Sequence, residues 1–260
     1  MFGSKISRWF FDRPQTSNSI RTFHLLFVLC LLALASWWIF AGELEGWDRV
    51  WPYRWTFWKG WILTLELSVS TLCLSVVIGL AAALARKASF FPLRSLAAIY
   101  VEAIRGMPLL VIILLFYYVV AHKFHLENRF VAGIFVLSLF SGAYLSEIFR
   151  AGIESVGQSQ WESARAIGLT RTQTACFVVF PQALRHVLPP LAGQFASLIK
   201  DSSLLSIIAI QEFTLAAEQI NSATFTNLES FFPLAVGYLI LTFPISLICK
   251  CLEKRMRYET

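Results

Sequence analysis

The hydrophobic residues of this chain are gathered into long blocks, separated by shorter stretches that carry most of the charges. An α-helix needs about 20 apolar residues to cross the hydrocarbon core of a bilayer, and several blocks reach that length. The pattern predicts six membrane-spanning helices, at residues 24–41, 57–85, 96–121, 130–149, 191–210 and 231–249. The expected fold class is therefore an all-α, multi-pass membrane protein.

Composition agrees with this pattern, and the positions of the charges predict an orientation. Hydrophobic residues make up 57% of the chain and charged residues only 15%, well below the roughly 25% of an average soluble domain. Of the 22 Lys and Arg residues, 15 fall in connections on one predicted side, 5 on the other, and Arg105 and Lys200 lie within spans. Cytoplasmic loops are enriched in Lys and Arg. Both termini and residues 150–190 are therefore predicted to be cytoplasmic, and the net charge of +6 does not indicate a nucleic-acid partner.

The first apolar block follows a basic N-terminal region, as the core of a secretory signal peptide does. It is long for a signal peptide, and residues 36–40 are the bulky Ser-Trp-Trp-Ile-Phe instead of a small cleavage site. We expect a retained membrane anchor. The domain organisation is then 1–56 for the cytoplasmic N-terminus, the first helix and an outer Trp-rich connection, 57–250 for the transmembrane core, and 251–260 for a basic cytoplasmic tail.

The connection at 150–190 contains two helix-start signatures. Ser159 with Glu162, and Thr170 with Gln173, have the spacing of a capping box, in which two side chains satisfy each other's backbone N–H groups. Gly168 lies between them, where a residue free to adopt a positive φ can end a helix. The segment is predicted to form a short helix, a tight bend and a second helix.

One face of the first short helix is apolar although the segment is predicted to lie outside the bilayer. Trp161, Ala164 and Ile167 share this face at helical spacing. The face is expected to pack either on the rest of the chain or on a soluble partner.

The same segment resembles the EAA loop of ABC-importer permeases. That loop carries the residues EAA, a Gly a few positions later, and an aliphatic residue shortly before a Leu-Pro pair. The corresponding residues here are 162–164 (Glu-Ser-Ala), Gly168 and 178–181 (Val-Val-Phe-Pro). Ser163 and Phe180 are mild departures from the pattern.

Other segments are similar to the polar amino-acid permease subfamily. They are EAIRGMPLLV from Glu102, EIFRAGIESV from Glu147, FPQALRHVLPPL from Phe180 and LIKDSSLLSII from Leu198. The resemblance covers about residues 57–250 and implies a five-helix permease core, with the first span as an N-terminal extension. It also implies residence in a bacterial inner membrane.

The resemblance implies a transport subunit and not an enzyme. Two permease subunits, identical or sister chains, would form the path for a polar amino acid such as glutamate, aspartate or glutamine. A pair of ATPase subunits would bind ATP and Mg, and an outer solute-binding protein would deliver the substrate. This sequence contains no GxxxxGK[ST] phosphate loop and no metal-ligand spacing, so no cofactor is expected on this chain. The coupling residues implied by the loop are Trp161, Glu162, Ala164 and Gly168.

Charges within predicted spans are the candidate substrate contacts, because a charge at the bilayer centre is costly and is usually functional. Lys200 and Asp201 are the tenth and eleventh residues of the fifth span, roughly 15 Å deep. Neighbouring helical residues point about 100° apart, so each needs its own partner. They either contact the substrate, together with Ser202, or form a structural ion pair or helix cap.

The remaining intramembrane charges have a simpler alternative. Glu66 could face a cavity or the flank of the first span. Glu102 and Arg105 share a helix face at a spacing of three and are expected to pair with each other, unless they line the path. Pro108 is expected to kink that helix. Glu147 and Arg150 have the same spacing, and a mutual pair is predicted.

Two other classes of function compete with an ATP-driven importer. An ion-coupled secondary transporter would also need intramembrane charges, but it would not need a coupling loop. A non-transporting membrane scaffold could use the loop to bind a soluble partner, but it would not need charges within its spans.

Overall fold

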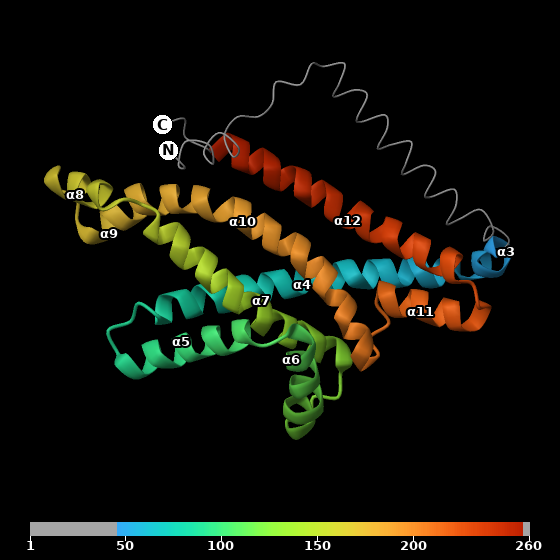
Figure 1. Cartoon of the computed structure of the whole chain (residues 1–260). Coiled ribbons are helices and arrows are strands. Elements are labelled where there is room, and N and C mark those ends of the chain that lie inside the picture. Colours follow the sequence, from blue (N-terminus) through green and yellow to red (C-terminus); the bar gives the residue numbers. More distant parts are fainter. Residues whose placement is uncertain (1–45, 257–260) are drawn as a thin grey trace, which may run out of the picture. The chain divides into compact units, whose positions relative to one another are not determined.

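A computed structural model describes residues 46–256, and this part of the chain is helical throughout (Figure 1). The predicted first span and residues 257–260 lie outside the described residues. The chain divides after Asp48 into two units, and the second unit holds nearly all of the described residues. The helical elements, with π- and 3₁₀-segments labelled η, are α3 (Trp47–Val50), η1 (Trp51–Tyr53), α4 (Arg54–Ala85), α5 (Phe91–Gly106), α6 (Leu109–Leu115), η2 (Phe116–Ala121), α7 (Arg129–Glu154), α8 (Gln158–Ala166), α9 (Arg171–Thr174), η3 (Ala175–Val179), α10 (Phe180–Asp201), η4 (Ser202–Ile208), α11 (Phe213–Thr224) and α12 (Asn227–Met256).

The described part contains three helical stretches that are long and apolar enough to cross a membrane. They are Trp47–Ala85, Arg129–Glu154 and Asn227–Lys254, and the bent pair α5 and α6–η2 makes a fourth if it counts as one span. The prediction of an all-helical membrane protein is confirmed. The second, fourth and sixth predicted spans each coincide with one of these helices.

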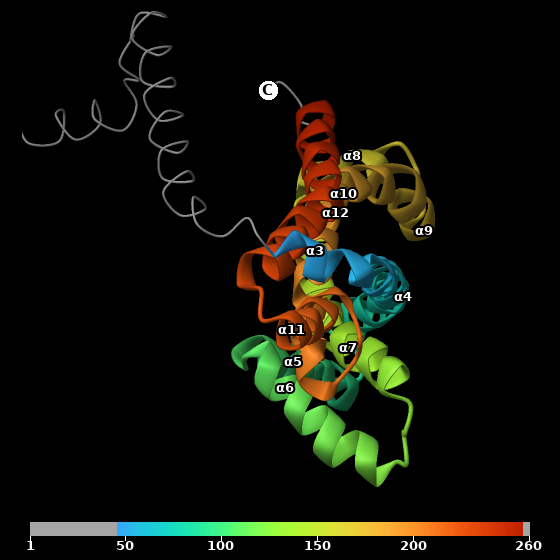
Figure 2. The same cartoon turned by 90° about the vertical axis from the view of Figure 1, so that its right-hand side faces the viewer.

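The third predicted span, residues 96–121, is not the single kinked helix that the sequence predicts. α5 ends at Gly106, Met107 and Pro108 are extended, and α6 then leaves at an angle of 114°. Proline has no N–H for the helical ladder, and its ring disfavours the helical conformation of the preceding residue. Pro108 therefore separates two helices. Figure 2, seen from the end of the unit that carries α11, shows α6 leaving on the side away from α12.

The predicted start of the fifth span, at residue 191, is also wrong. Helical structure is continuous from α9 through η3, α10 and η4. The second helix of the predicted loop and the fifth span are therefore parts of one continuous helix over residues 171–208. Pro181 comes just after the π-segment η3, where the continuous helix changes its hydrogen-bond pattern and accommodates a residue without an N–H. Pro189 and Pro190 are accommodated inside the helix. The α-helix tightens to a 3₁₀-helix at Ser202.

The polar and acidic sequence of residues 211–230 predicts an exposed segment with a short helix at the surface. The helix exists as α11, but Ala216, Ala217 and Ile220 are buried because α11 packs on α4 and α12. Glu212 caps it by accepting hydrogen bonds from the N–H groups of Thr214 and Leu215, at 2.9 and 2.8 Å. The segment is therefore part of the packed bundle.

The cap of α11 also connects it to the last helix. The Tyr238 hydroxyl of α12 donates to the Glu212 carboxylate at 3.0 Å. Burial raises the pKa of Glu212 to about 7, although the hydrogen bonds that it accepts oppose that rise. Glu212 is thus a buried connection between α11 and α12.

The most extensive helix pair of the unit is α4 with α7, and small residues make it possible. Ser68 and Ser75 are buried on α4, and each hydroxyl donates to the carbonyl four residues earlier. Gly79 of α4 and Gly142 of α7 continue the contact. These hydroxyls are satisfied within their own helix, whereas the buried hydroxyls of Thr71 and Ser146 make no hydrogen bond within the described residues. The small side chains let the two backbones approach closely.

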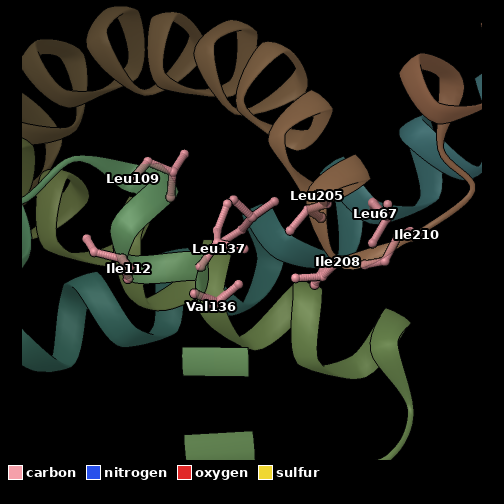
Figure 3. Packing of buried hydrophobic residues seen from close by; sticks show 9 residues of the cluster. Leu67, Leu109, Ile112, Val136, Leu137, Leu205, Ile208 and Ile210 are labelled. Atoms are coloured by element: carbon pink, nitrogen blue, oxygen red, sulfur yellow. The ribbon is translucent and has the colours of Figure 1, made fainter. Parts of the chain in front are cut away.

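One apolar cluster fills the space between these helices and η4. Figure 3 shows Leu67 of α4, Val136 and Leu137 of α7, and Leu205 and Ile208 of η4 converging on it. Leu109 and Ile112 of α6 close it from the other side. The 3₁₀ turn of η4 is therefore fixed by packing, and the polar residues just before it hold a defined position.

Candidate functional site

The predicted EAA loop forms α8, a bend and α9 at one end of the unit, opposite α11 (Figure 1). Thr170 and Gln173 make the predicted capping box, with Thr170 N–H donating to Gln173 Oε1 at 2.9 Å and Gln173 N–H donating to Thr170 Oγ1 at 3.3 Å. Gly168 has φ +85°, as expected for the residue at the bend. The Ser159 box is wrong: Gly157 is the N-cap, so α8 begins at Gln158, two residues before the start that a Ser159 cap implies. The Gln158 side chain donates to Glu162 at 2.9 Å.

The apolar face of α8 is divided between the two expected alternatives. Ala164 is buried, and Trp161 packs against the cluster formed by Val156, Val179 and Ala183. Ile167 is 77% exposed. Trp161 and Ala164 therefore fix the position of α8 on its own chain, and they leave Glu162 and Ile167 exposed for another protein.

Lys200, Asp201 and Ser202 lie where α10 changes into η4. Lys200 is exposed, Asp201 is half-buried and Ser202 is fully buried, as expected for residues that point in different directions. Neither Lys200 nor Asp201 takes part in an ion pair within residues 46–256. The Asp201 side chain makes no capping hydrogen bond, so Asp201 does not act as a cap. The hydroxyls of Ser202 and Ser203 donate to the carbonyls of Ile199 and Lys200, at 2.7 and 2.6 Å.

Gln194 of α10 contacts Ser141 of α7, with Nε2 and Oγ 3.4 Å apart. This contact places the helix that carries Lys200 and Asp201 beside α7. The depth of the two charges in a bilayer stays a prediction.

Glu66 lines a cavity of about 890 Å³ near the end of the unit that carries α11. Its charged and amide-bearing walls come from α4, from the start of α7 and from the turn that leads into α11: Glu66, Glu127, Asn128, Arg129, Gln211 and Gln219. Glu66 thus lines a cavity of the described chain, and the alternative contact with the first span lies outside the described residues. Lys200 and Asp201 do not line this space, so the predicted substrate residues do not form one site.

Arg105 does not pair with Glu102 as predicted. Its guanidinium lies 3.7 Å from Glu147 of α7 and over the ring of Tyr144, with the ring centre 5.5 Å away. Glu102, on the same helix, is exposed. The predicted pair of Glu147 and Arg150 is confirmed, with Arg150 Nη2 at 2.5 Å from Glu147 Oε2.

Glu147 has a third arginine partner that sequence reasoning missed. Arg86, at the end of α4, donates to Glu147 Oε1. Arg86 and Arg105 are 61 and 42 residues away from Glu147 in sequence, so no helical spacing could have indicated this cluster. Only the Arg150 contact has a local signal.

Comparison with known proteins gives a consistent result. The family described as "Binding-protein-dependent transport system inner membrane component" matches residues 75–258. The chain is 38% identical over 197 residues to the probable glutamine ABC transporter permease protein GlnM of Bacillus subtilis, covering 76% of this chain and 91% of that one. It is also 38% identical to the L-cystine transport system permease protein TcyB of the same organism, covering 83% and 93% of the two chains.

A solved structure agrees with the sequence relatives. The crystal structure of an amino acid ABC transporter with histidines has a chain that superposes on this one with a TM-score of 0.75 at 34% identity. The alignment covers 80% of this chain and 98% of that chain. The fold is therefore shared over nearly the whole length of that chain.

Proposed function

The chain belongs to the family of inner-membrane permease components of binding-protein-dependent ABC transporters, and from this premise we propose that it forms the import path for a polar amino acid such as glutamine or cystine. As a member of this family it is a transport subunit and not an enzyme. Its partners are an ATPase and a solute-binding protein. The coupling loop carries the proposal, because it presents an exposed charge and an exposed apolar residue on a helix fixed to its own chain.

The proposed coupling helix is α8, which docks on the ATPase through Glu162 and Ile167. Trp161 and Ala164 act indirectly by fixing α8 against the chain. Gly168, with its positive φ, sets the direction in which the chain leaves α8. ATP and Mg are bound by the ATPase subunits, and this chain holds no cofactor of its own.

The proposed topology has six spans with both termini and the α8–α9 loop in the cytoplasm, in a bacterial inner membrane. The Lys and Arg distribution supports this orientation. The fifth span is the rod of α10 and η4, which connects the coupling loop directly to Lys200 and Asp201. A motion of the loop is then transmitted to these charges along one continuous helix.

The proposed substrate path lies between this chain and a second permease chain, identical or related. Lys200, Glu102 and Arg105 are exposed in the single chain although they belong to apolar helices. Charges at such positions face a water-filled cavity or another protein. We assign Asp201 to the ammonium group of the substrate and Lys200 to its carboxylate, Ser202 to the support of this pair, Arg105 to a separate contact along the path, and Glu66 to the outer cavity.

The proposed function predicts uptake that needs every partner. Proteoliposomes containing this chain, its ATPase and its binding protein are expected to accumulate radiolabelled L-glutamine or L-cystine only when ATP is present, because the energy comes from ATP hydrolysis. Uptake that persists without ATP and follows a sodium or proton gradient would instead identify an ion-coupled secondary transporter. If no amino acid is taken up under either condition, the protein would be a non-transporting membrane scaffold.

Asp201→Asn is expected to lower the rate of this uptake at least about tenfold, because a hydrogen bond to a charged group contributes about 1.5–3 kcal/mol. Basal ATP hydrolysis should remain. Ser203→Ala is the matched control, since the Ser203 hydroxyl donates to the carbonyl of Lys200 in its own helix, at 2.6 Å. Equal uptake by wild type and Asp201→Asn would contradict a role for this carboxylate in the path.

A further inference from the structure

Three helices direct an arginine at one carboxylate. Arg86 from the end of α4 and Arg150 from α7 donate hydrogen bonds to Glu147, and Arg105 from the end of α5 lies 3.7 Å from it. Glu154 pairs with Arg150 at 2.6 Å. Three guanidinium groups thus share two carboxylates, so the cluster has an excess of positive charge.

The three arginines are not held equally. The Arg86 side chain is 18% exposed and the Arg150 side chain is hydrogen-bonded to both acids. Arg105 makes the longest of the contacts to Glu147, and its side chain is 38% exposed. It is therefore the arginine that can leave Glu147 at the lowest cost.

The surroundings of Arg105 leave room for a ligand. It is the second-last residue of α5, where the carboxyl end of a helix stabilises a cation whichever anion it binds. A Cβ placed on the next residue, Gly106, would meet no atom of the described chain within 4 Å, and the chain then turns away at Met107 and Pro108. A guanidinium in this position can present two parallel N–H groups to a carboxylate.

We propose that Glu147 is a built-in competitor for the carboxylate of the transported amino acid at Arg105. In the empty protein Arg105 pairs with Glu147, and the α-carboxylate of the substrate replaces Glu147 when it arrives. Arg86 and Arg150 retain Glu147 during the exchange. The cluster is then a carboxylate-binding site near the α8 end of the path, and it is separate from Asp201. This inference rests on the proposed function.

A purely structural cluster would have the same contacts, because it would hold α4, α5 and α7 together. The two roles differ in the sign of one effect. If the cluster is structural, removal of either partner damages the same arrangement. If Glu147 competes with the substrate, removal of Arg105 weakens ligand binding and removal of the Glu147 charge strengthens it.

The test is equilibrium binding of radiolabelled L-glutamine to the full-length permease with its ATPase in lipid nanodiscs, without the binding protein. Arg105→Gln is expected to weaken binding at least about tenfold, the value of a charge-assisted hydrogen bond. Glu147→Gln is expected to tighten binding several-fold. Glu218→Gln, which removes an exposed carboxylate of α11 at the opposite end of the unit, is the matched control and should bind as wild type does.

Two further measurements complete the test. L-Glutaminamide, which lacks the carboxylate, should bind equally to wild type and Glu147→Gln. If Glu147→Gln does not accumulate, Glu147→Asp takes its place: it keeps a carboxylate for Arg86 and Arg150, but it lengthens the already long contact with Arg105, so binding should again tighten. Weaker or unchanged glutamine binding in the Glu147 variants overturns the inference, as does undetectable binding by a wild type that transports glutamine. Failure of wild-type uptake would instead reject the proposed function.

Discussion

Glu162→Lys is expected to abolish ATP-driven uptake while the protein still inserts and folds. The Glu162 side chain is exposed on α8, and it accepts a hydrogen bond from Gln158 one turn earlier in the same helix. Reversal of its charge therefore removes little from the fold but places a cation in the proposed ATPase interface. Loss of a central interface contact costs about 2 kcal/mol or more, so co-purification of the ATPase should fall roughly 30-fold.

The control for this prediction is Glu218→Lys, which makes the same charge reversal at an exposed position of α11 at the opposite end of the unit. It should keep the ATPase bound. Gly168→Asp is a second route to the same loss, because it adds a side chain and a charge at a residue with φ +85°. Normal co-purification and normal uptake in both loop variants would remove the coupling role from α8.

Gly79→Leu is expected to prevent accumulation of folded protein. A Cβ atom at Gly79 would lie 2.7 Å from the Cβ of Leu145 and 2.9 Å from the carbonyl oxygen of Gly142, so α4 and α7 would have to separate. Overpacking of this kind costs about 3 kcal/mol or more, a large part of the stability of a typical protein. The yield of monodisperse protein in detergent and its melting temperature are the measurements.

Gly193→Leu is the matched control for the same residue change. A Cβ atom at Gly193, within α10, would meet no atom of residues 46–256 within 4 Å. This variant should accumulate and melt as wild type does, because leucine favours the helix more than glycine. If Gly79→Leu and Gly193→Leu gave equal yields, close approach of α4 and α7 would not be what limits folding.

Local patterns in the sequence were sufficient to predict that most of the helices exist. Apolar length located α4, α7 and α12, and the Thr170–Gln173 pair and Gly168 located the bend of the coupling loop correctly. These features depend on residues a few positions apart, and hydrogen bonding and backbone geometry act at that range. The EAA pattern and the RGMPLLV segment were likewise enough to indicate the family, which the comparisons confirm.

The residues at which helices begin were harder to predict, because two local signals can compete for one start. Ser159 and Glu162 have the spacing of a capping box, yet Gln158 forms the first turn of a helix in which Trp161 packs on Val179 and Ala183 and Ala164 is buried. The apolar run of the fifth span begins at Leu191, and hydropathy therefore predicts the start of the helix there. The helix is already formed at that point, since helical hydrogen bonds continue through polar residues that hydropathy does not score as membrane.

The amino-acid sequence by itself determined the helical membrane class, the bend between α8 and α9, and the family of this protein, because each of these depends on local periodicity or on a short motif. Only the tertiary structure decided that Arg105 turns from Glu102 to Glu147, that Arg86 joins them, and that Lys200 and Asp201 have no ion-pair partner within the described chain. A charge pairs with whichever opposite charge the packing of distant helices brings within a few ångströms. The packing of α4 on α7 is set by small residues far apart in the sequence, so these partners carry no local signal.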